Sequence, residues 1–137
     1  MAYFSVYARF YDGLQKIGRF FAGVFKFTPA RLYLAGIFLL QVLAWWQGII
    51  IKRRLAGEWL VLHYNIDFGV DMLGEPRQIF WFPVFGLLLL VFNFLLTAAF
   101  SRREGFRVLA HLFFSASLLF NIFLNLALFA IYLFNFQ

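Results

Sequence analysis

The chain places its apolar positions in three long, continuous runs. These runs cover residues 32–51, 79–100 and 108–135, and none of them contains Asp, Glu, Lys or Arg. A helix needs about 20 residues to cross the ~30 Å hydrocarbon core of a bilayer, and each run reaches that length. Continuous apolar runs also lack the alternating pattern of a membrane barrel strand. The pattern therefore predicts three transmembrane helices.

The first 28 residues follow a different pattern. Aromatic and aliphatic residues recur at steps of three and four from Tyr3 to Val24, and polar residues repeat these steps on a second face. This period is typical of an amphipathic helix, and basic residues opposite aromatic ones favour a position at the membrane surface. The alternative is a face that docks a partner protein. The residues that we expect to bind anionic lipid headgroups are Arg9, Lys16, Arg19 and Lys26.

Composition supports a membrane protein. Hydrophobic residues make up 64% of the 137 residues and charged residues 13%, against about 45–50% and about 25% in soluble proteins. A soluble enzyme, a disordered chain and a nucleic-acid-binding domain are therefore excluded as first interpretations, and the absence of Cys excludes disulfides and thiolate metal sites. We predict an all-α integral membrane protein with two parts. Residues 1–28 form the interfacial helix, and residues 29–137 form a three-helix transmembrane domain with an external loop at 52–78.

The basic residues predict an orientation, because Lys and Arg accumulate on the cytoplasmic side of a membrane. Of the twelve, eight lie before the first apolar run or between the second and third, and four lie between the first and second. This distribution predicts a multi-pass protein of the cell (inner) membrane with a cytoplasmic N-terminus and an external C-terminus. The Lys52-Arg53-Arg54 cluster favours the opposite orientation.

The loop at 52–78 is the only sizeable polar stretch, and it holds four of the six acidic residues. Carboxylates and an imidazole recur there at intervals of four from residue 63 to residue 75, which could gather oxygen and nitrogen donors for a cation. Gly69 and Gly74 disfavour a continuous helix, and we expect residues 59–62 to form a short strand or lie at the interface, with turns at 63–65 and 74–76. The alternative to a ligand site is a hydrogen-bonded turn. The candidate ligand or metal residues are His63, Asn65, Asp67 and Asp71.

Several polar side chains interrupt the apolar runs. Amide and ionisable groups in lipid are costly and usually face protein or water, so we expect them to make hydrogen bonds between helices. A polar conduit for protons or ions is the alternative. The interrupting residues are Gln41, Gln47, Asn93, His111, Asn121, Asn125 and Asn135, and those singled out for helix–helix contacts are Asn93, His111, Asn121 and Asn125.

One segment carries a resemblance. His63–Asp71, with the sequence HYNIDFGVD, precedes Gly74 and an apolar run that contains Pro83. It resembles a group of small bacterial membrane proteins of uncharacterised function that share L-H-Y-N-x-x-F-G-x-D-x-x-G ahead of a helix with an early Pro. The resemblance covers residues from about 31 to 137 and implies no biochemical activity. More distantly, the segment is similar to the H-F-N-x-x-G module of SdpI-type toxin-immunity and signalling proteins. That module usually has a Pro shortly before the His and one residue fewer before the Gly.

The sequence favours a protein that is not an enzyme, because no strong nucleophile has an obvious base nearby. We expect an accessory subunit or scaffold that acts by assembly through its external loop and interfacial helix. Two alternatives are a sensor or immunity-type protein that binds a ligand or cation between His63 and Asp71, and a small oligomeric channel or transporter that uses Asn121 and Asn125. The expected partners are the bilayer, anionic headgroups and either another protein or a second copy, with no nucleic acid and no cofactor.

Overall fold

A computed structural model describes Tyr11, Gln15, Gly18 and residues 21–55, 57–65, 67 and 69–136. Three long helices dominate this part of the chain: α2 (Thr28–Leu55), α3 (Trp81–Ala99) and α4 (Phe106–Phe136). Strands β1 (Leu60–Asn65) and β2 (Gly69–Gly74) and the 3₁₀ helix η1 (Pro76–Phe80) lie between α2 and α3. The prediction of three long apolar helices is confirmed, since α2, η1 with α3, and α4 are each long and apolar enough to cross a membrane.

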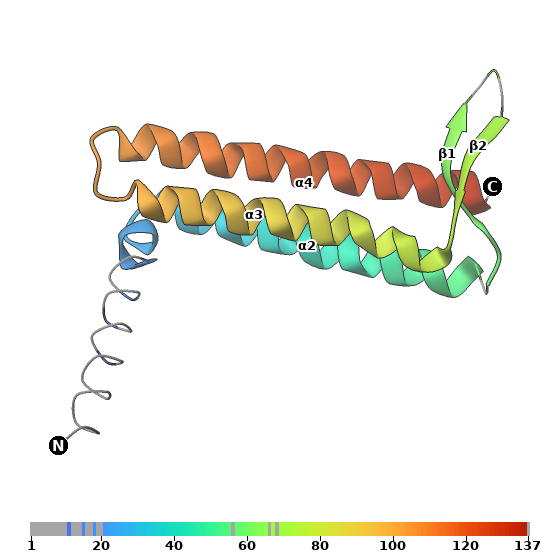
Figure 1. Ribbon diagram of the computed structural model, residues 1–137, viewed down its shortest axis with the longest axis horizontal. Coiled ribbons are helices and arrows are strands. Elements are labelled where there is room, and N and C mark those ends of the chain that lie inside the picture. Colours follow the sequence, from blue (N-terminus) through green and yellow to red (C-terminus); the bar gives the residue numbers. More distant parts are fainter. Residues whose placement is uncertain are drawn as a thin grey trace, which may run out of the picture.

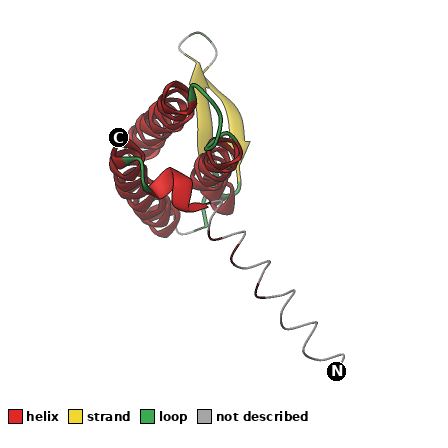
Figure 2. Ribbon diagram, turned by 90° about the vertical axis from the view of Figure 1, so that its left-hand side faces the viewer, coloured by secondary structure: helices red, strands yellow, loops and turns green. Residues whose placement is uncertain are grey.

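The three helices lie side by side and form one elongated bundle (Figure 1). Helices α2 and α4 run in the same direction and α3 runs in the opposite one, so the α3–α4 connection and the start of α2 share one end of the bundle. The two strands and the C-terminus lie at the other end. Seen from the end, the helices make a triangle with the strands beside it (Figure 2).

Two apolar clusters, one near each end of the bundle, make up its core. The cluster near the strands joins residues of α2, α4, β1 and η1, among them the fully buried Ile51, Leu60 and Ile79. The other cluster lies near the α3–α4 connection and includes the fully buried Val24 and Phe114. The bundle ends are therefore packed with aliphatic and aromatic side chains, and the buried amides lie between them.

The segment after α2 differs from the expectation in its local structure. Residues 63–65, expected in a turn, belong to β1, and β1 pairs with β2 in an antiparallel hairpin. The pairing places His63 opposite Met72 and Asn65 opposite Gly69, so the turn of the hairpin lies between Asn65 and Gly69. The pairing register shifts twice along β1, between Val61 and His63 and between His63 and Tyr64, which indicates bulges. The hairpin makes the chain a helical bundle with a small sheet at one end.

Helix α2 begins where the sequence places a Thr-Pro pair. Proline is favoured in the first turn because its missing N–H has no helical acceptor there, and the Arg31 side chain donates to Thr28 Oγ1 at 2.9 Å. Just before this point, residues 21–25 are helical, Val24 is fully buried and the Phe21 ring stacks on Phe94 at 5.5 Å. The predicted lipid-binding residues Arg9, Lys16 and Arg19 lie outside the described residues, and Lys26 is exposed.

Candidate functional site

The β1–β2 hairpin carries the four candidate ligand residues. His63 and Asn65 lie on β1, Asp67 lies in the turn and Asp71 lies on β2. His63 and Asp67 are exposed. Among the residues that the structure describes, no group of three or more His, Asp or Glu side chains lies close enough to hold a metal ion. The hairpin therefore spreads these residues along two strands and a turn, and does not gather the described ones around one point.

The base of the hairpin is fastened to the end of α4. Asn135 donates from Nδ2 to the Val61 carbonyl at 2.9 Å and accepts the Val61 N–H on Oδ1, also at 2.9 Å. The amide thus bonds both backbone groups of one strand residue, as a neighbouring strand would. Leu60, the preceding residue, is fully buried in the core cluster at this end. These contacts hold β1 in a fixed position relative to the bundle.

The other end of the hairpin is joined to α3 by a tight connection. Glu75 and Gln78 form a reciprocal capping box at the start of η1, and the Glu75 N–H donates to Gln78 Oε1 at 3.1 Å. A Cβ at Gly74 would meet the ends of the Gln78 and Leu62 side chains, so a larger residue at the end of β2 would force these side chains to move. The hairpin is therefore positioned at both of its ends.

Four amides form what we call the amide ladder between α2 and α4. Gln41 on α2 donates to Asn121 on α4 at 2.8 Å, and Gln47 donates to Asn125 at 3.0 Å. The side-chain N–H groups of both asparagines donate to backbone carbonyls one turn earlier on α4. Asn125 Nδ2 also donates to the Leu40 carbonyl on α2. Gln41, Asn121 and Asn125 are buried. The carbonyl oxygens of both glutamines are buried and have no partner among the described residues.

Further polar contacts extend along the same bundle. Asn93 on α3 donates to Ser117 Oγ at 2.9 Å and to the Phe113 carbonyl at 3.2 Å, both on α4. Tyr33 Oη and His111 Nδ1 lie 3.2 Å apart at the end near the α3–α4 connection, and this pair is exposed. The structure thus places Asn93, His111, Asn121 and Asn125 between helices. It brings Asn121 and Asn125 into one network and leaves Asn93 and His111 in separate contacts.

Several contributors to these contacts are not among the residues singled out, and three of them carry a signal in the sequence. They are the two ladder glutamines, which are visible in the sequence as polar interruptions of an apolar run, and Arg54, whose Nη1 donates to Tyr132 Oη at 2.6 Å. Their partners could not be read from one sequence, because each pair is separated by 78 or 80 residues. A charged residue three positions after an apolar run and a tyrosine near the end of the given sequence are the signals that could have suggested the third pair.

A scan against protein-family models, a search of curated proteins and a search of solved structures each found no match to this chain.

Proposed function

We propose that the protein is a multi-pass membrane protein without enzymatic activity, and that it acts as an accessory subunit or scaffold by docking a partner on its β1–β2 hairpin. One observation carries the proposal: the hairpin is fixed to the bundle at both ends, yet it exposes large apolar side chains. Trp59, Met72 and Leu73 are 68%, 56% and 56% exposed. Exposed apolar side chains outside the long helices favour contact with a partner, and a surface that is already ordered loses less entropy when it binds.

The strand edge offers a second mode of contact. Asn135 occupies the backbone groups of Val61 on β1, whereas in the described part of the chain β2 has β1 as its only strand neighbour. The outer edge of β2 therefore has backbone groups that an added strand of a partner would pair. This arrangement directs a partner to β2 and away from β1.

The dimensions of α2 support insertion across a bilayer. Arg31 and Lys52 bound its charge-free stretch, and the 20 residues between these positions span about 30 Å at 1.5 Å per residue. This length is close to the ~30 Å thickness of the hydrocarbon core. The amide ladder supports a structural role for the buried polar groups, because they bond one another across the helix interface.

The orientation that we propose places the hairpin outside the cell. The bundle end that holds the α3–α4 connection carries five described basic residues against four at the hairpin end, and three more basic residues precede residue 21 in the sequence. The positive-inside tendency then places the hairpin on the external side. The five basic residues are Lys26, Arg31, Arg102, Arg103 and Arg107.

The docking proposal is tested by purification in mild detergent from the native membrane, followed by native mass spectrometry. We expect a complex heavier than the 16.1 kDa monomer, and we expect Met72→Gln with Leu73→Gln to release the partner. Val108→Gln is the matched control, because Val108 is a 72% exposed apolar residue at the opposite end of the bundle. A monomer without a co-purifying chain, or equal loss in the control, would contradict the proposal.

The orientation is tested separately with single cysteines, since the natural chain has none. Asp67→Cys should react with a membrane-impermeant maleimide in intact cells, and Arg103→Cys should react only after the cells are opened. The reverse labelling pattern would invert the topology, and extraction of the protein by alkaline carbonate would remove the claim of insertion.

A further inference from the structure

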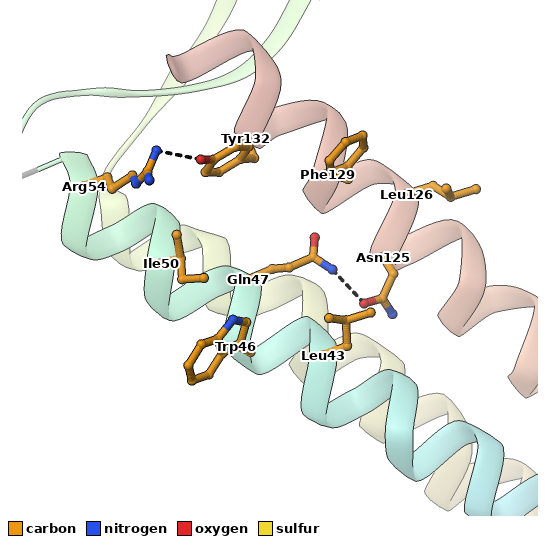
Figure 3. Close-up of a pocket in the computed structure, with 9 residues that line it drawn as sticks. All are labelled: Leu43, Trp46, Gln47, Ile50, Arg54, Asn125, Leu126, Phe129 and Tyr132. Atoms are coloured by element: carbon orange, nitrogen blue, oxygen red, sulfur yellow. Dashed lines mark hydrogen bonds between the residues drawn. The ribbon is translucent and has the colours of Figure 1, made fainter. Parts of the chain in front are cut away.

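A groove of about 510 Å³ lies between α2 and α4, in the half of the bundle nearer the hairpin (Figure 3). Its apolar wall consists of side chains such as Leu43, Ile50, Leu126 and Phe129. Its size falls within the range of about 300–1,000 Å³ that is usual for small-molecule sites. Two polar features distinguish this groove from an ordinary apolar furrow between helices.

The first feature is a guanidinium held at one end of the groove. The Arg54 side chain donates to Tyr132 Oη at 2.6 Å, and its guanidinium carbon lies 5.3 Å from the Tyr132 ring centre and 5.7 Å from that of Phe136. In the described part of the chain this guanidinium meets rings and a hydroxyl but no carboxylate. Because arginine has five N–H donors in a planar fork, a positive group with spare donors faces the groove.

The second feature is an unsatisfied acceptor deeper in the groove. Gln47 uses its Nε2 to bond Asn125, and its Oε1 is buried without a partner among the described residues. Figure 3 shows this oxygen directed away from Asn125, toward the space beside Ile50 and Phe129. A buried carbonyl without a donor is costly, and a purely hydrocarbon occupant would not relieve that cost.

We propose that this groove binds one molecule of an acidic lipid that carries a hydrogen-bond donor just below its head group. The phosphate or carboxylate binds Arg54, and an acyl chain lies along the apolar wall. A hydroxyl or amide N–H of the linkage region donates to Gln47 Oε1 once the side chains that bury this oxygen move aside for the lipid. The inference rests on the proposed insertion of the helices into a bilayer and is independent of docking at the hairpin.

The spacing of the two polar features suits such a molecule. Arg54 and Gln47 are seven residues apart on α2, which is about 10 Å along the helix axis. Each hydrogen bond to the lipid covers about 3 Å. The acid and the donor of the lipid are therefore only a few covalent bonds apart, as they are where a head group meets a sphingoid or hydroxylated linkage.

The test uses two probes with the same phosphate head group. Ceramide 1-phosphate has an amide N–H and a hydroxyl in its linkage, whereas phosphatidic acid of equal chain length has two esters, and phosphatidylcholine is the zwitterionic reference. Binding to the purified protein in neutral detergent is measured by native mass spectrometry. We expect ceramide 1-phosphate to bind about fivefold more tightly than phosphatidic acid, because it supplies the missing donor. We expect phosphatidylcholine to bind more weakly than both.

Three variants separate the two features. Arg54→Gln should weaken both acidic lipids about tenfold, since it removes a charged hydrogen bond. Arg53→Gln removes the same charge from a neighbour that does not line the groove and should leave binding unchanged. Gln47→Leu should keep phosphatidic acid bound and abolish the advantage of ceramide 1-phosphate. A melting curve without lipid checks that each variant is folded, and Tyr132→Phe replaces Arg54→Gln if the latter fails to fold, with a smaller loss expected for both acidic lipids.

Two results would overturn the inference. Equal losses in Arg53→Gln and Arg54→Gln would show attraction to a diffuse surface charge, and equal affinities of the two phosphate lipids for the natural protein would show that Gln47 selects nothing. Failure of insertion is distinguishable from both, because it would appear as extraction from native membranes by alkaline carbonate.

Discussion

Helix α2 meets its two neighbours in different ways. Four pairs of polar side chains connect it to α4: Tyr33 with His111, Gln41 with Asn121, Gln47 with Asn125 and Arg54 with Tyr132. Among the described residues, no side-chain hydrogen bond connects α2 to α3, and an apolar groove of about 860 Å³ lies between them. The α2–α4 interface is thus a polar seam, and the α2–α3 interface is apolar and less closed.

The polar seam explains how the register of α2 against α4 is set. The four pairs are separated by 78, 80, 78 and 78 residues, which is the nearly constant offset of two parallel helices in fixed register. Lipid tails are as apolar as leucine, so apolar contacts alone give helices in a bilayer little preference for one register. Buried amides need specific partners and can supply that preference. We therefore expect changes at the seam to alter assembly of the bundle, and changes on the lipid-facing surface to have little effect.

The largest expected effect comes from a substitution on α3 at the point where this helix contacts the polar seam. A Cβ at Gly86 on α3 would lie 2.5 Å from Gln41 Nε2 and 2.7 Å from Asn121 Oδ1, so Gly86→Ala should separate that hydrogen bond. Overpacking of this kind costs about 1–3 kcal/mol. Gly36→Ala is the matched control, because its nearest neighbour would be Leu118 Cδ1 at an ordinary 3.6 Å. Unfolding by SDS titration from mild detergent should show a loss for Gly86→Ala and none for Gly36→Ala.

A somewhat smaller effect is expected from removing one rung of the ladder. Asn121→Leu leaves both amide groups of buried Gln41 without partners, which should reduce the free energy of unfolding by about 1–2 kcal/mol. Adding Gln41→Leu removes those stranded groups as well. The double variant should therefore be more stable than the sum of the two single losses indicates. Strict additivity in the same SDS titration would show that the two amides are not coupled.

The next largest effect is expected from a substitution at the junction between the bundle and the hairpin. Asn135→Leu removes both bonds to Val61, while the burial of Leu60 remains. We expect faster hydrogen exchange at the amides of β1, by about tenfold, with the helix amides unchanged, because about 1.4 kcal/mol of local stability corresponds to that factor. If Asn135→Leu lowered global stability as much as Asn121→Leu, the junction would belong to the seam.

The comparison of the two interfaces also separates what the sequence predicts from what it does not. The three helices follow from apolar runs of membrane-spanning length, and the buried asparagines follow from the cost of amides in lipid. The partners of those asparagines do not follow, because a single sequence holds no information on which of two apolar helices lies beside α4. The strand character of His63 and Asn65 was also missed. Asparagine favours turns locally, and the pairing of β1 with β2 together with the anchor at Asn135 overrides that preference.

The smallest expected effect lies at the exposed end of the seam. Tyr33→Phe removes the hydroxyl that contacts His111 Nδ1 at 3.2 Å but keeps the edge-to-face contact of the rings, whose centres are 5.7 Å apart. Because this pair is exposed, water can replace the lost bond, and the free energy of unfolding should change by less than about 0.5 kcal/mol. Tyr33→Ala also removes the ring from its stack on Phe114 and should cost several times more. Equal losses for the two variants would mean that the hydroxyl, and not the ring, holds this end. The polar seam would then extend with undiminished strength from the hairpin to the opposite end of the bundle.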